Sequence, residues 1–185
     1  MQTDRALVVR AQGGDRAAFS DLAAGRIDRL VVLARLILRD PTSAEDAVQE
    51  ALVGAWRGLP SLRDPDRFDA WLRRLLIRAC SEQARHLRRG VTELTLLPTD
   101  GPPVADGQLS LARRDQLERG LRRLPVELRT VLVLVYYLDL PLTEAAQAMG
   151  IPLGTVKSRL HRAHDALRAE LEADARASHP KEQYA

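Results

Sequence analysis

Basic and hydroxyl side chains are concentrated between residues 155 and 162, near one end of the 185-residue chain. Apolar residues recur there at helical spacing, so a helix would bury one side and leave polar side chains on the other. The buried set is Val156, Leu160, Ala163, Leu167 and Leu171, and the outward set is Thr155, Lys157, Ser158, Arg159, His161 and Arg162. Arginine can bond guanine edges in a major groove, whereas lysine, serine and threonine can hold phosphates. This face is suited to binding duplex DNA.

The surrounding segment, residues 142–163, has the three features that a helix-turn-helix requires. These are a small residue where the helices cross, a residue that accepts left-handed backbone geometry at the turn, and an apolar anchor in the second helix. Ala146, Gly150 and Val156 supply them, at spacings of four and six. The alternative is an ordinary helical hairpin with a solvated basic face, but generic hairpins seldom meet all three constraints. We therefore predict a helix-turn-helix.

A second group of side chains is acidic and lies in residues 44–50, AEDAVQE. With Val48 facing inward, Asp46, Gln49 and Glu50 share the exposed side, because residues three and four apart are neighbours on a helix. Two carboxylates could perform acid–base chemistry, but no histidine, cysteine or glycine-rich loop lies nearby in the sequence. The pattern favours docking of another protein over catalysis, and a merely solvated face stays open as an alternative.

A third group makes residues 68–89 strongly basic. The arginines of this expected helix are Arg73, Arg74, Arg78, Arg85, Arg88 and Arg89. Trp71 lies among them, and basic side chains interleaved with an aromatic ring suit single-stranded or melted nucleic acid. The pattern equally fits a tryptophan in the core and a solvated basic face, so both interpretations stay open.

The elements that would position these groups are all helices. Thr42 and Glu45 have the spacing of a capping box, which predicts a helix from there to about Gly58. A turn-rich loop at residues 58–65 then precedes the long basic helix. With the apolar pattern that begins near Asp15, these helices form a bundle of about four, and helical spacing resumes from Leu117.

We predict an all-α fold of two small helical domains joined by a flexible linker, the C-terminal domain containing the helix-turn-helix. The expected bounds are residues 1–90 for the first domain, 91–114 for the linker, 115–171 for the second domain and 172–185 for a tail. Three prolines and two glycines interrupt the helical period between residues 91 and 110. Both domains carry a net positive charge and the linker a net negative one, a balance that suits a polyanionic partner.

Composition excludes several classes of protein. Cys80 is the only cysteine, so a disulfide framework and a cysteine-built zinc site are excluded. His161 and His164 lie three apart but lack a third metal ligand in sequence reach. The N-terminal stretch has no signal-peptide core, and no apolar run approaches the roughly 20 residues of a membrane span. We expect a soluble, cytoplasmic protein with no catalytic residue, no metal, no cofactor and no membrane insertion.

The order of the three groups resembles the extracytoplasmic-function (ECF) sigma factors of bacteria. The motifs that carry the resemblance are WRGLPSLRDPDRFDAWLRRLLIRAC after the acidic helix and GTVKSRLHRA at the end, and it runs from about Gly14 to Leu171. It implies a first domain that binds the β′ subunit of core RNA polymerase and melts and reads the minus-ten element. It also implies a second domain that binds the β flap and reads the minus-thirty-five element by helix-turn-helix.

The resemblance also assigns residues by position. It places Asp46, Gln49 and Glu50 on the polymerase-docking helix and brings a flipped minus-ten base to the loop at residues 58–65. The expected minus-ten contacts are Leu62, Arg63, Asp64, Trp71, Arg74 and Arg78. The expected minus-thirty-five contacts are Thr155, Lys157, Ser158, Arg159 and Arg162. Arg78 stands where the family often has asparagine, and Ala145 stands where isoleucine or valine is common.

A member of this family would be a dissociable, non-enzymatic specificity subunit and a monomer in the holoenzyme. Its partners would be core RNA polymerase and promoter DNA, and the family also suggests an anti-sigma factor. Two other interpretations remain open. A free-standing helix-turn-helix regulator would usually dimerise on a palindromic site, and a helical enzyme would use Asp46 and Glu50 as its acid and base.

Overall fold

The computed structural model describes residues 4–90 and 111–178, with side chains for residues 4–87 and 116–173. Within those residues every regular element is helical and no strand occurs, which confirms the predicted all-α fold. Most of the predicted linker, residues 91–110, and the last part of the tail, residues 179–185, lie outside the described residues.

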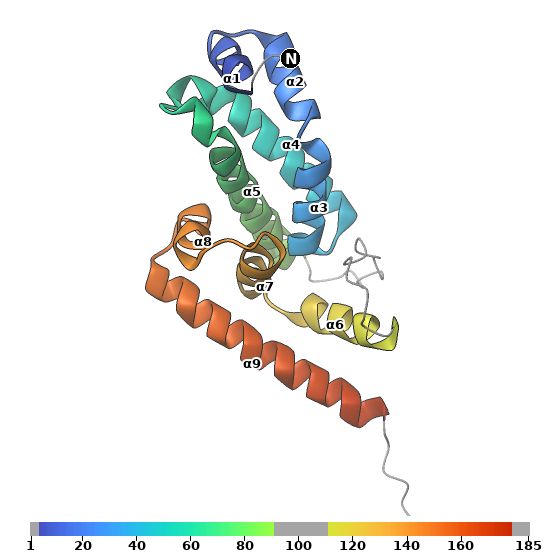
Figure 1. Cartoon of the computed structure of the whole chain (residues 1–185). Helices are drawn as coiled ribbons and strands as arrows, with labels where there is room; N and C mark the ends of the chain where they lie inside the picture. The colour runs from blue at the N-terminus through green and yellow to red at the C-terminus, as the bar shows by residue number, and fades with distance from the viewer. Residues whose placement is uncertain (1–3, 91–110, 179–185) are drawn as a thin grey trace, which may run out of the picture.

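The first half of the chain is a bundle of five helices around a leucine-rich core. They are α1 (Asp4–Gln12), α2 (Arg16–Ala24), α3 (Ile27–Leu38), α4 (Pro41–Gly58) and α5 (Phe68–Gly90). The largest fully buried side chains of this half are Leu22, Ile37, Leu72 and Leu76 from these helices and Leu59 from the turn that follows α4. α1 was not expected from the sequence, and it packs beside α2 at the end of the bundle farthest from α9 (Figure 1).

The start of α4 corrects one prediction. Asp40, rather than Thr42, is the N-cap residue, and its carboxylate accepts a hydrogen bond from the amide of Ser43 at 2.8 Å. Pro41 follows as the first helical residue, where its fixed φ and missing N–H carry no penalty. The capping box between Thr42 and Glu45 is therefore wrong: Asp-Pro is the stronger start signal, and it begins the helix two residues earlier.

The second half of the chain is built around one long helix. Its elements are α6 (Leu111–Arg123), α7 (Val126–Leu132), a π-helical turn (Val133–Tyr137), α8 (Leu142–Met149) and α9 (Leu153–Ser178). α9 extends beyond Leu171, where the apolar pattern suggested its end. α6, α7 and α8 all pack against α9, which forms one edge of the molecule (Figure 1).

The two halves contact each other through α8 and α7. Both pack against α5, and α7 also contacts α3 (Figure 1). At the end of α3, Arg39 adopts a left-handed φ of 60° and its side chain is only 5% exposed. Its Nη2 atom lies 3.4 Å from Oε2 of Glu118 on α6, and burial lowers the pKa of Arg39 more than Glu118 raises it. An ion pair thus joins the two halves at the end opposite α1.

Candidate nucleic-acid interface

The helix-turn-helix is formed by α8 and the start of α9. Gly150 has a φ of 65°, the left-handed geometry that favours glycine, and its amide donates to the carbonyls of Ala146 and Gln147. Val156 is fully buried, and Ala146 is 8% exposed at the helix crossing. Each residue that predicted the motif therefore has its expected structural role.

The start of α9 presents the polar side chains to solvent. Lys157, Ser158 and Arg162 are exposed, and Thr155 and Arg159 are half-buried. The Ser158 hydroxyl donates to the Thr155 carbonyl at 3.0 Å, and Arg162 Nε donates to the Ser158 carbonyl at 3.4 Å. The five predicted contacts for duplex DNA thus lie within two turns of one helix, and its face can enter a major groove.

The two histidines of α9 each contact a neighbouring side chain. His161 Nε2 lies 3.3 Å from Asp165 Oδ2, and His164 Nε2 lies 2.8 Å from the hydroxyl of Tyr136 on the π-helical turn. Within residues 4–87 and 116–173, no three His, Cys, Asp or Glu side chains lie together in a way that could hold a metal ion.

A second polar surface is formed by the loop between α4 and α5. Two short 3-10 turns, Leu59–Ser61 and Pro65–Arg67, flank its apex. There Leu62 is half-buried, whereas Arg63 and Asp64 are exposed. The Asp64 carboxylate caps the second turn by accepting from the Asp66 amide at 3.1 Å. The loop thus projects two opposite charges from a backbone held at both ends.

The N-terminal part of α5 continues this surface. Trp71 is half-buried with its ring across Gly58, where an added Cβ would lie 3.1 Å from the indole. Its ring is also 6.1 Å from that of Phe68. Trp71 therefore forms a wall beside the loop, with part of the ring still exposed.

The arginines of α5 lie in two different environments. Arg74 is exposed, and it lines a cavity of about 430 Å³ with Arg67 and Arg73 of the same half and with Thr143, Glu144 and Gln147 of α8. One turn further on, Arg78 Nε donates to Glu82 at 3.0 Å. The helix-turn-helix therefore lies against part of the predicted minus-ten face.

The acidic face of α4 adjoins the Arg78 end of the α5 surface, because Glu50 and Arg78 share Glu82 as a partner. Asp46, Gln49 and Glu50 are all exposed. Partial burial and a hydrogen bond with Glu82 raise the pKa of Glu50, whereas a hydrogen bond from Arg78 lowers the pKa of Glu82. Gln49 also borders an apolar groove of about 580 Å³, whose walls are Phe19, Ile27, Val31, Val48, Leu52, Val53 and Trp56.

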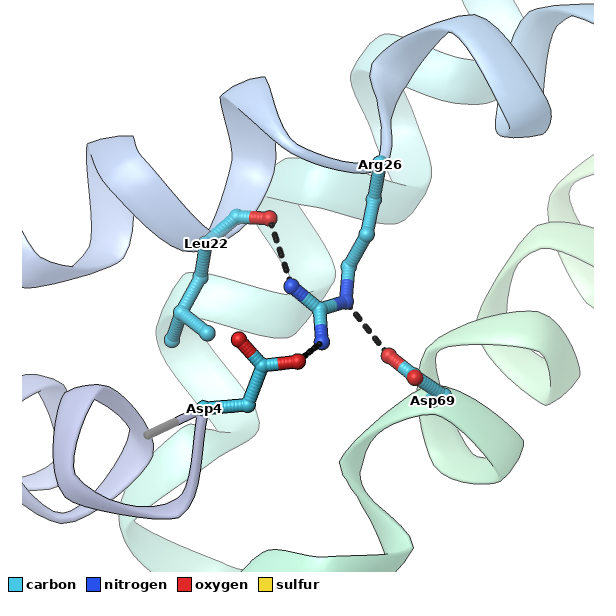
Figure 2. Close-up of polar contacts among 4 residues, drawn as sticks. All are labelled: Asp4, Leu22, Arg26 and Asp69. Atoms are coloured by element: carbon cyan, nitrogen blue, oxygen red, sulfur yellow. Dashed lines mark hydrogen bonds and ion pairs between the residues drawn. The ribbon is translucent and has the colours of Figure 1, made fainter. Parts of the chain in front are cut away.

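Sequence reasoning missed the cluster that ties α1 to α5. Arg26 precedes α3, and its guanidinium donates to Asp4 at 2.8 Å, to Asp69, and to the Leu22 carbonyl at 3.2 Å (Figure 2). Burial acts to lower the pKa of Arg26, but the bonds to Asp69 and Asp4 outweigh it and raise the pKa. The guanidinium also lies 5.2 Å from the centre of the Phe68 ring. No sequence spacing links Asp4, Arg26 and Asp69, because they lie on α1, between α2 and α3, and on α5.

Cys80 lies on the buried side of α5. Its side chain is fully buried, and burial raises the pKa of the thiol to about 12. Such a thiol is unreactive at neutral pH. In the part of the chain that the structure describes, no helix combines the length and the hydropathy that a membrane span needs.

Comparison with known proteins identifies both halves of the chain. Residues 26–90 match the family Sigma-70 region 2, and residues 114–167 match Sigma-70, region 4. The ECF RNA polymerase sigma factor SigM of Mycobacterium tuberculosis H37Rv is 36% identical over 162 residues, which cover 88% of this chain and 81% of SigM. The ECF RNA polymerase sigma factor SigW of Bacillus subtilis 168 is 30% identical over 176 residues, covering 89% of this chain and 94% of SigW.

A solved structure shows the same arrangement of helices. The sigma factor RpoE of Bartonella quintana, in complex with the anti-sigma factor NepR, has a TM-score of 0.65 and 26% identity. The match covers 84% of this chain and 98% of RpoE. Because relatives at 30% identity or more match along most of their own length, the chain belongs to the ECF RNA polymerase sigma factors, which bind core RNA polymerase and promoter DNA to initiate transcription.

Proposed function

We propose that this sigma factor uses its three polar surfaces for three separate tasks. Asp46, Gln49 and Glu50 on α4 dock on core polymerase. The loop at residues 58–65 and the start of α5 melt and read the minus-ten element, through Leu62, Arg63, Asp64, Trp71, Arg74 and Arg78. Thr155, Lys157, Ser158, Arg159 and Arg162 on α9 bind the minus-thirty-five element.

The observation that carries this proposal is the geometry of the helix-turn-helix. The left-handed Gly150 and the buried Val156 fix α9 against α8, and this leaves Lys157, Ser158 and Arg162 exposed on one side. The second domain, residues 115–171, is therefore the duplex-reading part, and the first domain, residues 1–90, holds the docking and melting surfaces.

The contact between the two halves gives the free protein a specific property. α8 lies against the start of α5 and shares a cavity with Arg67, Arg73 and Arg74. Promoter DNA must reach part of that surface, so the two halves have to separate or shift first. Polymerase docking offsets the cost of this step, and the isolated protein binds its promoter only weakly.

The protein acts as a non-enzymatic subunit in the cytoplasm, where polymerase and chromosome are found, and it is a monomer in the holoenzyme. RpoE of Bartonella quintana forms a complex with the anti-sigma factor NepR. The shared fold supports an anti-sigma factor as a partner of this chain too.

Run-off transcription with core polymerase and fragmented genomic DNA tests the proposal. We expect a small set of defined start sites that share one upstream and one downstream element. Omitting the protein or the core enzyme should abolish them. A purified protein that binds a palindromic duplex tightly as a dimer, without core polymerase, would instead identify a free-standing regulator.

A further inference from the structure

One side chain of α1 supports the loop that is proposed to read the minus-ten element. Gln12 is the last residue of α1, and its carboxamide is half-buried beneath the loop. Its Nε2 atom donates to the Leu59 carbonyl at 3.2 Å and to the Leu62 carbonyl at 2.6 Å. A single amide group thus joins the start of the loop to its apex.

The Leu62 carbonyl depends on this contact. Among the described residues, Gln12 makes the only hydrogen bond to that oxygen, whereas the Leu59 carbonyl also accepts from the Leu62 amide at 3.1 Å. Leu62 has an extended backbone, with φ −72° and ψ 107°, so the chain leaves the 3-10 turn at this residue. The direction of Arg63 and Asp64 is therefore set where Gln12 binds.

α1 is itself held firmly enough to act as a support. Val8 and Ala11 are 1% and 2% exposed, and they pack into the core of the bundle. On the other side of the loop, Arg5 pairs with Asp66. Asp4 joins the Arg26 cluster, which continues to Asp69 at the start of α5 (Figure 2). Gln12 thus presents its amide from a helix anchored to both ends of the loop.

We propose that Gln12 is a positioning residue for minus-ten recognition. By holding the Leu59 and Leu62 carbonyls, it fixes the loop in the conformation that receives a flipped base. The loop then loses less conformational entropy when it binds DNA. The inference rests on the proposed function of the loop. It extends the reading apparatus to α1, which lies outside the residues that match Sigma-70 region 2.

Two substitutions at this position test the inference. Gln12→Met keeps the length of the side chain and removes its N–H donors. Gln12→Glu keeps the shape of the side chain but places carboxylate oxygens, which repel, against the two carbonyls. Each variant, with core polymerase, is given a promoter library randomised across the minus-ten element, and open complexes are sequenced. We expect preference at one or two minus-ten positions to fall about tenfold for Gln12→Met and further for Gln12→Glu. Affinity for core polymerase and preference in the minus-thirty-five element should stay at the parent values.

A matched control separates positioning from general stability. Leu33→Val removes one methylene from the core at α3, where the side chain is 5% exposed, and does not touch the loop. Hydrogen exchange at residues 62–64 gives a second readout, which Gln12→Met should accelerate and Leu33→Val should not.

The outcomes distinguish this inference from the function on which it rests. If the parent protein gives no promoter-specific start, the proposed function fails and the role of Gln12 fails with it. If the parent initiates specifically and the Gln12 variants keep its base preference, the role of Gln12 alone is overturned. Equal losses of preference in Leu33→Val and Gln12→Met would also overturn it, because general stability would then explain both.

Discussion

The two candidate DNA surfaces of this sigma factor are prepared for binding in opposite ways. The minus-thirty-five face of α9 is short and continuous, and Lys157, Ser158 and Arg162 are exposed on it. The minus-ten face combines a loop with one end of α5, and it is braced by α1 and partly covered by α8. The first surface is available in the free chain, and the second is preformed but partly covered where Arg74 faces α8.

The proposed function accounts for this difference by what each surface would bind. A duplex presents its groove without prior distortion, so an exposed helix is sufficient to read it. A flipped base has first lost its stacking, which costs a few kcal/mol, and the site that accepts it gains from being rigid. A partly covered site that opens fully on the polymerase would favour melting in the promoter complex.

The largest effect is expected from weakening the binding to core polymerase, because neither DNA surface can then act at a promoter. Asp46→Lys combined with Glu50→Lys reverses the charge of the α4 face and should weaken core binding by about 4 kcal/mol, roughly a thousandfold. Helix content should stay unchanged, because both side chains are exposed. Competition with the parent protein for core polymerase measures the effect.

The matched control is Asp21→Lys combined with Asp28→Lys, which makes the same change in charge on exposed parts of α2 and α3. It should compete almost as well as the parent. If the α4 variant does so too, this acidic face is only solvated and docking occurs elsewhere.

The next largest effect is confined to the minus-thirty-five face. Arg159→Ala should cost about 1–3 kcal/mol on the preferred sequence and flatten preference at one base pair, because arginine can bond a guanine with two N–H groups. Lys157→Ala should weaken all sequences nearly alike and lower the salt slope by about one, because lysine meets phosphate as a point charge. Holoenzyme binding to a library randomised in the upstream element, at two salt concentrations, measures both.

Arg159 is half-buried, whereas Lys157 is exposed, so their roles differ in geometry as well as in chemistry. If Arg159→Ala loses affinity uniformly and keeps its base preference, Arg159 holds the backbone and another side chain of α9 reads the bases.

A smaller effect should appear when the closed arrangement is weakened. Glu118→Gln removes the charge that faces Arg39 across the contact between the two halves. The free energy that holds the two halves together should fall by about 1 kcal/mol. The free protein should then expand, and its affinity for a pre-melted minus-ten strand should rise about fivefold. Small-angle scattering and strand binding without core polymerase measure the two effects.

Glu170→Gln is the control, because Glu170 pairs with Arg123 within the second half of the chain at 2.7 Å. If Glu118→Gln leaves both the size and the strand affinity of the free protein unchanged, the contact does not limit access to α5.

The sequence could predict those features whose residues lie close together along the chain. The helix-turn-helix was predictable because Ala146, Gly150 and Val156 fall within eleven residues, and the structure confirms the fold role of each. The start of α4 was missed by two residues because two overlapping cap signals compete there, and Asp40 prevails over Thr42.

The support of the loop could not be predicted in the same way. Gln12 and Leu62 are 50 residues apart, and no periodic pattern connects them. The apolar residues Leu7, Val8 and Ala11 do have helical spacing, so α1 could have been proposed from the sequence, but not what its last residue would touch. The contact of α8 with α5 belongs to the same class, because it depends on how two separately patterned domains meet.

The last prediction is that Cys80 stays unlabelled by thiol reagents, with or without core polymerase. Cys80 is fully buried, and burial raises the pKa of its thiol to about 12, so the reactive thiolate is scarce at pH 8. A thiol reagent should modify it in urea but not in the native protein, and binding to core polymerase should leave it unmodified. Labelling that begins on docking would show that α5 is uncovered by loosening of its own domain rather than by movement of α8.

Gly120 has a consequence for building hybrid sigma factors. A Cβ at this position of α6 would lie 2.8 Å from a methyl carbon of Leu167 on α9, so the Leu167 side chain packs on Gly120 and would have to move to admit a larger residue. A chimera that exchanged α9 alone would bring a foreign side chain against Gly120, or leave a void there. The crossover point for such a swap therefore belongs before α6, with α6 to α9 inherited as a single block.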